Sequence, residues 1–218
     1  MRAKDQHVVI AIDGPAASGK SSVARELARR FGFVYVNSGA MYRAVTWHIL
    51  HAGIDPHDRV MIVSCVEEAQ IVSDLQNNES RILINEQDPS AHLHDDTVNN
   101  SVSLVSLVPR VREILGRKMH GYAREYDLVM EGRDIGSVVF PDTPFKFYLD
   151  ASPQVRLRRR AAQGQRDEIA ARDLADSSRP ASPLVIAKDA EVIDTSHLTI
   201  EAVVAEIVHR LKSKNFPI

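Results

Sequence analysis

The sequence of 218 residues has little of what marks secreted, membrane-spanning or nucleic-acid-binding proteins. Its single cysteine, Cys65, excludes an internal disulfide and is typical of a reducing compartment. No apolar run approaches the roughly 18 residues of a membrane span, and residues 1–7 are polar and charged, unlike a secretory signal. A net charge of −2 argues against a general nucleic-acid binder. We therefore expect a cytoplasmic protein with no nucleic-acid or membrane partner.

Internal repeats, low-complexity segments and metal-binding clusters are also missing from the sequence. The histidine pairs His48/His51 and His92/His94 stand without cysteine or acidic partners at metal-ligand spacing, so we expect them to be surface or packing residues. The length fits one domain with insertions or two small domains.

What the chain does have is a complete phosphate-loop pattern, G-x-x-x-x-G-K-[ST], at residues 14–21. The apolar run 8–12 before it is typical of a buried parallel strand, and the apolar spacing after it predicts a helix. Lys20 is expected to reach the outer phosphates, and the Ser21 hydroxyl to ligate Mg²⁺ brought with ATP. The residues expected to bind ATP are Gly14, Pro15, Ala16, Ala17, Ser18, Gly19, Lys20, Ser21 and Ser22.

Strands alternate with helices along most of the chain, which predicts an α/β fold. The expected architecture is a five-stranded parallel sheet flanked by helices, with the ligand crevice at the carboxyl ends of its strands. The five predicted strands are residues 8–12, 33–37, 127–131, 145–150 and 190–194. The predicted helices follow the phosphate loop or cover residues 38–53, residues 58–69, a segment starting near Pro109 and a segment capped by Thr199.

The middle of the chain differs from this alternation. Residues 71–75 and 81–85 predict two strands joined by a polar turn, and residues 86–100 predict a loop that returns to the core. We interpret residues 63–100 as a small β-rich insertion, with the core formed by residues 1–62 and 101–218.

A phosphate loop predicts nucleotide binding but not a particular reaction. The absence of an Asn-Lys-x-Asp motif disfavours common GTPases, and a motor or helicase would be longer. A small phosphotransferase fits, because such a reaction needs positioning and positive charge more than covalent chemistry. The arginine-rich segment 156–180 supplies that charge and is expected to be a mobile lid; a solvated helix face or an RNA-binding patch is the alternative.

Several further motifs give the sequence a family resemblance. In order, they are Ile12-Asp13-Gly14-Pro15, Ser18-Gly19-Lys20-Ser21, Ser38-Gly39-Ala40-Met41-Tyr42-Arg43, Pro109-Arg110-Val111-Arg112, Gly132-Arg133-Asp134-Ile135-Gly136, Val138-Val139-Phe140-Pro141, Phe147-Tyr148-Leu149-Asp150-Ala151, Arg172-Asp173, Asp176-Ser177, Arg179 and Pro183-Leu184. Together they run through nearly the whole chain, which resembles the bacterial cytidylate kinases among the nucleoside monophosphate kinases. The resemblance implies transfer of the γ-phosphoryl of ATP to CMP or dCMP, with the β-rich insertion binding the monophosphate. Separately, we expect a monomer, although the sequence does not decide the oligomeric state.

The resemblance also implies roles for individual residues. Ser38, Arg43 and Arg133 would hold the CMP phosphate. Ser103, Arg112 and Asp134 would read the cytosine. Arg172 and Asp176 would meet the sugar hydroxyls, with Arg179 near the phosphates. The expected catalytic residues are Lys20, Arg172 and Arg158, and Arg159 or Arg160 is expected to face solvent.

The chain departs from the family pattern at two places. Asn37 stands where the family usually has Asp, and the segment between Arg160 and Arg172 is short. Two alternatives stay open: another small phosphate-loop kinase acting on UMP, AMP or shikimate, and a nucleotide-dependent switch without a small acceptor. The sequence leaves the preference between CMP and dCMP and among donor nucleotides undecided.

Overall fold

The computed structural model describes residues 7–162, 173–174, 176–179, 182–214 and 216. They divide into two compact units, one formed by residues 1–36 and 122–218, the other by residues 37–121. Each unit is described by itself below. No helix in the described residues is long and apolar enough to cross a membrane.

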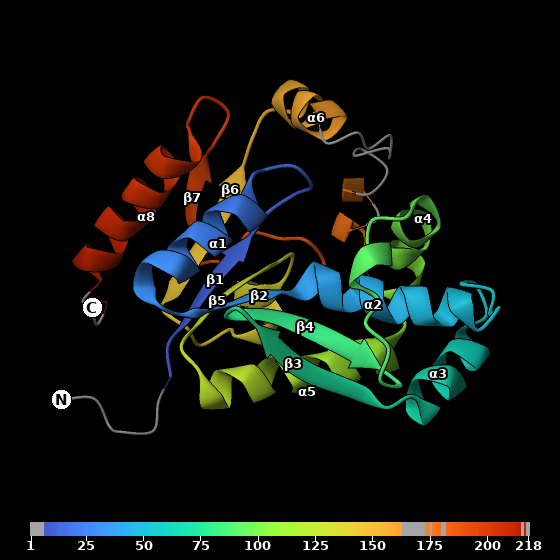
Figure 1. The fold of residues 1–218 in the computed structure, drawn as a ribbon. Coiled ribbons are helices and arrows are strands. Elements are labelled where there is room, and N and C mark those ends of the chain that lie inside the picture. The colour runs from blue at the N-terminus through green and yellow to red at the C-terminus, as the bar shows by residue number, and fades with distance from the viewer. Residues whose placement is uncertain (1–6, 163–172, 175, 180–181, 215, 217–218) are drawn as a thin grey trace. The chain divides into compact units, whose positions relative to one another are not determined.

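The first unit is built on a parallel sheet (Figure 1). Its strands lie in the order β2-β5-β1-β6-β7, and the printed pairs of β1 with β5, β1 with β6 and β6 with β7 are all parallel. The strands are β1 (Val9–Asp13), β2 (Val34–Asn37), β5 (Leu128–Gly132), β6 (Phe145–Asp150) and β7 (Glu191–Asp194). All five predicted strands are therefore confirmed, with ends shifted by one residue or less.

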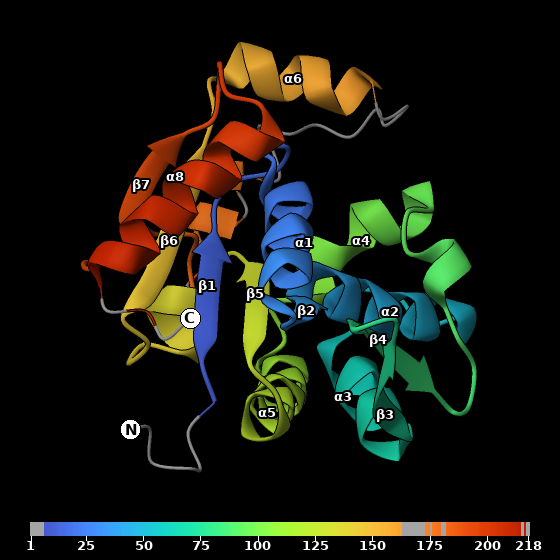
Figure 2. The ribbon, with the colours of Figure 1, turned by 60° about the vertical axis from the view of Figure 1, so that its left-hand side comes forward.

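Helices α1 (Lys20–Phe31) and α8 (Ile200–Ser213) lie side by side in both ribbon views (Figures 1 and 2). Val23 and Leu27 of α1 and Ile207 of α8 are buried in one apolar cluster with Ile10 and Ile12 of β1. The described residues of the unit also form α6 (Pro153–Ala162) and the short π-helix η2 (Ile135–Val139). The apolar periodicity therefore predicted the packed faces of both long helices, although Ile200 at the start of α8 is 42% exposed.

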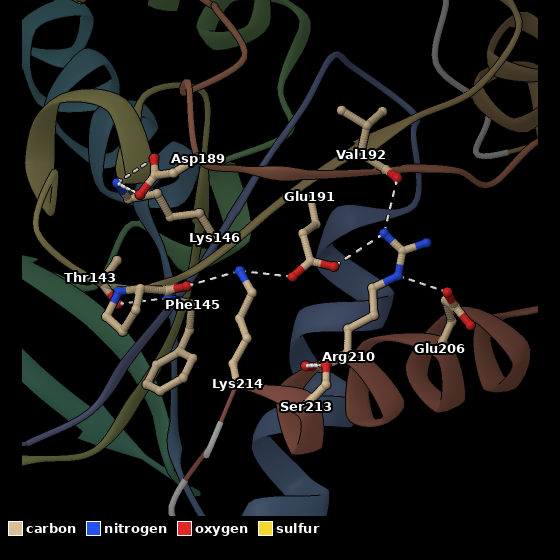
Figure 3. A network of polar contacts seen from close by, with 11 residues as sticks. Thr143, Phe145, Lys146, Asp189, Glu191, Val192, Glu206, Arg210, Ser213 and Lys214 are labelled. Carbon is tan, nitrogen blue, oxygen red and sulfur yellow. Dashed lines mark hydrogen bonds and ion pairs between the residues drawn. The ribbon is translucent and has the colours of Figure 1, made fainter.

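A network of charges ties α8 to the amino ends of β6 and β7 (Figure 3). The Lys146 ammonium lies 2.7 Å from a carboxylate oxygen of Asp189, and Glu191 pairs with both Arg210 and Lys214. The phosphate loop begins at the opposite, carboxyl end of β1, because it follows Asp13 directly. The network therefore stabilises the unit away from the candidate site.

The second unit is mostly helical, with one antiparallel pair of strands. It contains α2 (Ser38–His51), α3 (Arg59–Glu68), β3 (Ile71–Gln76), β4 (Glu79–Ile84), the short helix η1 (Ser90–His92), α4 (Asp96–Val105) and most of α5 (Pro109–Glu125). Strands β3 and β4 confirm the predicted hairpin. With them the described residues contain seven strands, not five.

One local prediction in the second unit was wrong. The segment 86–100 is not a plain loop, because it contains η1 and the start of α4. The apolar residues Val98, Val102 and Val105 are buried at helical spacing on α4, which overrides the polar composition around them.

Candidate active site

The phosphate loop connects β1 to α1 and is shaped by two glycines with positive φ. Gly14 has a φ of 149°, and a Cβ there would lie 2.0 Å from the backbone oxygen of Leu149, so the neighbouring strand leaves no room for a side chain. Gly19 has a φ of 95° and caps α1. The loop thereby points the helix N-terminus, with its unpaired amides, into the site, as phosphate binding needs.

Lys20 is the first residue of α1 and lies almost entirely inside this loop. It is 5% exposed, and its Nζ donates a 2.7 Å hydrogen bond to the carbonyl of Pro15. Burial and the positive charge of Arg133 lower its pKa from 10.5 to about 7, against the opposing effects of Glu131, Asp13 and Asp173. The lysine side chain thus bends back onto its own loop, and its ammonium has a pKa near neutral pH.

The turn after β5 carries the two charged residues of the Gly-Arg-Asp motif. Arg133 donates from Nε to the Asp176 carboxylate at 2.8 Å, and Arg179 pairs with the other oxygen of the same carboxylate. Burial is the largest single effect and lowers the pKa of Arg133, but the charge and hydrogen bond of Asp176, together with the charges of Glu131 and Asp173, outweigh it and the net pKa is raised. Asp134 is 5% exposed. The first unit therefore brings three of the predicted nucleotide-binding residues, Arg133, Asp176 and Arg179, into one ion-pair cluster.

Helix α6 contributes two arginines to the phosphate loop, Arg156 and Arg159, although we expected Arg159 or Arg160 to face solvent. The Arg156 guanidinium donates to the carbonyl of Ala16 at 3.2 Å and pairs with Asp173. Asp173 in turn accepts a hydrogen bond from the Ala16 amide at 3.2 Å. The Asp173 carboxylate therefore accepts a hydrogen bond from a loop amide that the phosphate-loop pattern predicts to bind phosphate.

The other α6 arginine at the loop is Arg159. It donates to the side chain and carbonyl of Thr195 at 3.1 and 2.7 Å, and to the carbonyl of Ala17 at 3.5 Å. Arg158, which the sequence analysis favoured, is exposed, and the predicted catalytic Arg172 lies outside the described residues. The composition of this segment predicted many arginines near the phosphates. It did not predict which of them lie on the side of α6 that contacts the phosphate loop, Arg156 and Arg159.

In the second unit, the predicted monophosphate residues lie on α2, α4 and α5. Ser38 is 5% exposed at the start of α2. Arg43 donates from Nε to the side chain of Asn99 at 3.4 Å. The Arg112 guanidinium lies 5.4 Å from the centre of the Tyr42 ring. The unit therefore places Arg43 and Arg112 beside polar and aromatic partners of its own.

Two smaller points concern the ends of these helices. Asn37, not Ser38, caps α2, because its side-chain oxygen accepts a hydrogen bond from the Ala40 amide at 2.9 Å.

Ser103 lies on α4, and the hydroxyl of Ser106, three residues further on, donates to the Ser103 carbonyl at 2.8 Å. The Ser106 hydroxyl therefore donates to a backbone carbonyl of its own helix end.

The residues at the phosphate loop fit a magnesium ion carried by a nucleotide. No group of three or more His, Cys, Asp or Glu in the described part of the chain has metal-binding geometry. Such a cage is not needed, since Mg²⁺ in kinases keeps several waters and is held by one or two protein groups plus phosphate oxygens. Ser21 is exposed on the first turn of α1, so its hydroxyl fits that use.

Comparison with known proteins gives consistent matches over both units. A family model described as cytidylate kinase matches residues 10–213. A cytidylate kinase of Mycobacterium leprae (strain Br4923) is 41% identical over 220 residues, covering 95% of this chain and 97% of the relative. A cytidylate kinase of Pelotomaculum thermopropionicum (strain DSM 13744 / JCM 10971 / SI) is 42% identical over 217 residues, covering 94% and 96%. One of Caldanaerobacter subterraneus subsp. tengcongensis is 41% identical over 216 residues, covering 94% and 95%.

Proposed function

Because this chain belongs to the cytidylate kinase family, we propose that it transfers the γ-phosphoryl group of ATP to CMP or dCMP. The products are ADP and CDP or dCDP. The observation that carries the proposal is the convergence of the phosphate loop and the Arg133–Asp134 turn on the carboxyl ends of the paired strands β1 and β5. Ligands of open α/β sheets bind outside this edge.

The first unit is proposed to hold the donor nucleotide and the transferring phosphoryl group. Loop amides between Gly14 and Ser22 donate to the phosphate oxygens, and Lys20 supplies a positive charge to the outer phosphates. Mg²⁺, bound with ATP and ligated by Ser21, bridges phosphate oxygens and neutralises charge that develops on them. Arg158 and Arg172 of the proposed lid, residues 156–180, add positive charge around the transferring group.

Roles in acceptor binding are proposed for residues of each unit by itself. Ser38, Arg43 and Arg133 bind its phosphate, and Asp176 and Arg179 bind near its sugar and phosphate. Asp134 accepts from the exocyclic amine of cytosine, while the Arg112 guanidinium and the Ser103 hydroxyl donate to ring acceptors. The second unit, which contains the insertion 63–100, thus serves as the monophosphate-binding part.

An acceptor panel at fixed ATP and Mg²⁺ tests the proposal. ADP release is coupled to a spectroscopic readout, with CMP, dCMP, UMP, AMP and shikimate as separate acceptors. Turnover with CMP or dCMP that exceeds the other acceptors supports the proposal. Preference for UMP, AMP or shikimate would identify another small kinase, and ATP binding without acceptor-dependent turnover would identify a nucleotide switch.

The cellular setting follows from the same proposal. A kinase of this kind acts on small nucleotides, and no nucleic-acid or membrane partner is needed for the reaction. We propose that it works in the cytoplasm as a monomer, which size-exclusion chromatography with light scattering tests directly.

A further inference from the structure

Asp13, the last residue of β1, has a buried carboxylate that the phosphate-loop pattern does not use. It stands opposite Gly132 in the pairing of β1 with β5, two strands that lie side by side in Figure 2. One carboxylate oxygen accepts the amide of Ile135 at 2.8 Å, and the other accepts the amide of Gly136 at 2.7 Å. The side chain is therefore a clamp between the end of β1 and the turn after β5.

The clamped turn is the one that carries Arg133 and Asp134. The two amides held by Asp13 come directly after Asp134, and the carbonyl of Asp134 accepts the amides of Val138 and Val139 from η2. The backbone that follows Asp134 is thus held both by the Asp13 carboxylate and by the hydrogen bonds of η2.

The turn also fits tightly against its surroundings at Gly136. A Cβ there would lie 3.1 Å from two side-chain carbons of Lys146 and 3.4 Å from a carboxylate oxygen of Asp13. An added Cβ would therefore be crowded by Lys146 and would reach van der Waals contact with Asp13.

Keeping a carboxylate at this position is unfavourable for the isolated side chain. Asp13 is 5% exposed, and burial raises its pKa to about 6, although the two backbone hydrogen bonds oppose this. Asparagine has nearly the same volume but only one acceptor oxygen, so it matches one of the two amides and presents an N–H group to the other. The two bonds distinguish a carboxylate from its amide at this site.

We propose that Asp13 is a positioning residue for acceptor recognition, which fixes the turn from which Arg133 and Asp134 reach CMP. This role rests on the proposed function, because it assigns the clamp to the acceptor side of that reaction. Asp13 itself does not touch the substrate. Its effect passes through the amides of Ile135 and Gly136 to the two side chains just before them.

The clamp should affect the acceptor more than the donor. The described contacts of the Asp13 carboxylate go to the turn after β5, whereas the phosphate loop is shaped by Gly14, Gly19 and the start of α1. One effect on the donor side is expected, since the Asp13 charge helps to keep Lys20 protonated. At pH 7, where Asp13 is mostly ionised and about half of Lys20 is protonated, loss of that charge should weaken ATP binding a few-fold at most.

The test compares Asp13→Asn with a matched control, Asp127→Asn, in steady-state kinetics at pH 7, where most of the Asp13 carboxyl is ionised. Asp127 also accepts a backbone amide across β1 and β5, from Val8 at 2.7 Å, but near the amino ends of these strands. For Asp13→Asn we expect KM for CMP to rise about 10- to 100-fold, because a displacement of about 1 Å can reduce productive binding by that much. KM for ATP should change less than about threefold, and Asp127→Asn should leave both values near those of the wild type.

A second variant perturbs the same contact from the other side and guards against misfolding of the first. Gly136→Ala keeps Asp13 but adds a Cβ that Lys146 and the Asp13 carboxylate must accommodate, so KM for CMP should again rise. Gly121→Ala is its control, since a Cβ there meets nothing within 4 Å.

The possible outcomes separate this inference from the function on which it rests. Absence of CMP turnover in the wild type would remove the proposed function itself. Normal CMP turnover in the wild type, with Asp13→Asn lowering only kcat or changing both KM values equally, would overturn the positioning role. A purely structural role for Asp13 predicts a lower apparent kcat alone, because partial unfolding removes active enzyme without changing the KM of the folded remainder.

Discussion

Binding of ATP should be coupled to uptake of a proton by Lys20. Without ligand, burial and the charge of Arg133 lower the pKa of this lysine to about 7, and its ammonium donates to the Pro15 carbonyl. A polyphosphate in the loop would favour the charged form and raise the pKa toward its ordinary 10.5. The perturbation to test is therefore pH, with ATP and no acceptor present.

The expected magnitude follows from the pKa of the ligand-free site. At pH 8 a group with a pKa of about 7 is roughly one-tenth protonated, so binding should take up about 0.9 proton per ATP if the bound pKa exceeds 9. At pH 6 the uptake through Lys20 should fall to about 0.1. Affinity for ATP should accordingly decrease by up to about tenfold per pH unit between pH 7 and 9.

Isothermal titration calorimetry in two buffers of different ionisation enthalpy measures this proton directly. Lys20→Arg is the matched variant, because it keeps a positive charge that cannot be lost in this range and leaves only protons taken up by other groups. The difference between wild type and variant at pH 8 is the contribution of Lys20. Equal uptake by the two proteins, or uptake that does not change between pH 6 and 8, would refute the low pKa.

The same pKa makes a prediction for stability without ligand. The folded protein binds fewer protons than the unfolded chain between pH 7 and 10.5, the two pKa values of Lys20. The contribution of Lys20 to the free energy of unfolding should therefore increase as pH rises through this window. Urea unfolding of wild type and Lys20→Met at pH 7 and 9 should show that the wild type gains stability relative to the variant at the higher pH.

Three further predictions concern selectivity, the lid and the fold. Asp134→Asn should lower the ratio of kcat/KM for CMP over UMP by about tenfold or more, since a good base contact is worth about 1–3 kcal/mol; an unchanged ratio would mean that Asp134 does not read the base. Arg172→Ala should lower kcat much more than it weakens ATP binding, whereas Arg160→Ala should change kcat little. A larger loss of single-turnover rate for Arg160→Ala than for Arg172→Ala would exclude Arg172 as a transition-state contact. Lys146→Met should lower the free energy of unfolding by about 1–3 kcal/mol by leaving the Pro141 carbonyl without its buried donor, with KM for CMP and ATP unchanged.

Much of the fold could be predicted because it depends on local patterns of apolar residues. The run 8–12 and the glycines after it specify a strand, a loop and a helix within about 25 residues, and the structure confirms all three. Helix α4 was harder, because its apolar residues are diluted by Asp, Asn and Ser that favour turns.

The side chains around the phosphate loop could not be predicted in the same way. Arg156, Arg158 and Arg159 are close in sequence and equal in charge, and only the phase of α6 separates those that reach the loop from the exposed one. Asp173 and Thr195 approach the loop from segments far away in the chain. Such long-range contacts depend on packing that a single sequence does not display.

The ion pairs of the first unit explain how a site rich in buried cations stays folded without a ligand. Arg133 and Arg179 share the carboxylate of Asp176, and Arg156 pairs with Asp173. Each pair satisfies charges whose burial alone would be strongly unfavourable. Substitution of either partner therefore removes a possible substrate contact and also leaves a buried charge unpaired. Loss of activity in such variants identifies a role in binding only when the free energy of unfolding is measured alongside the KM of each substrate.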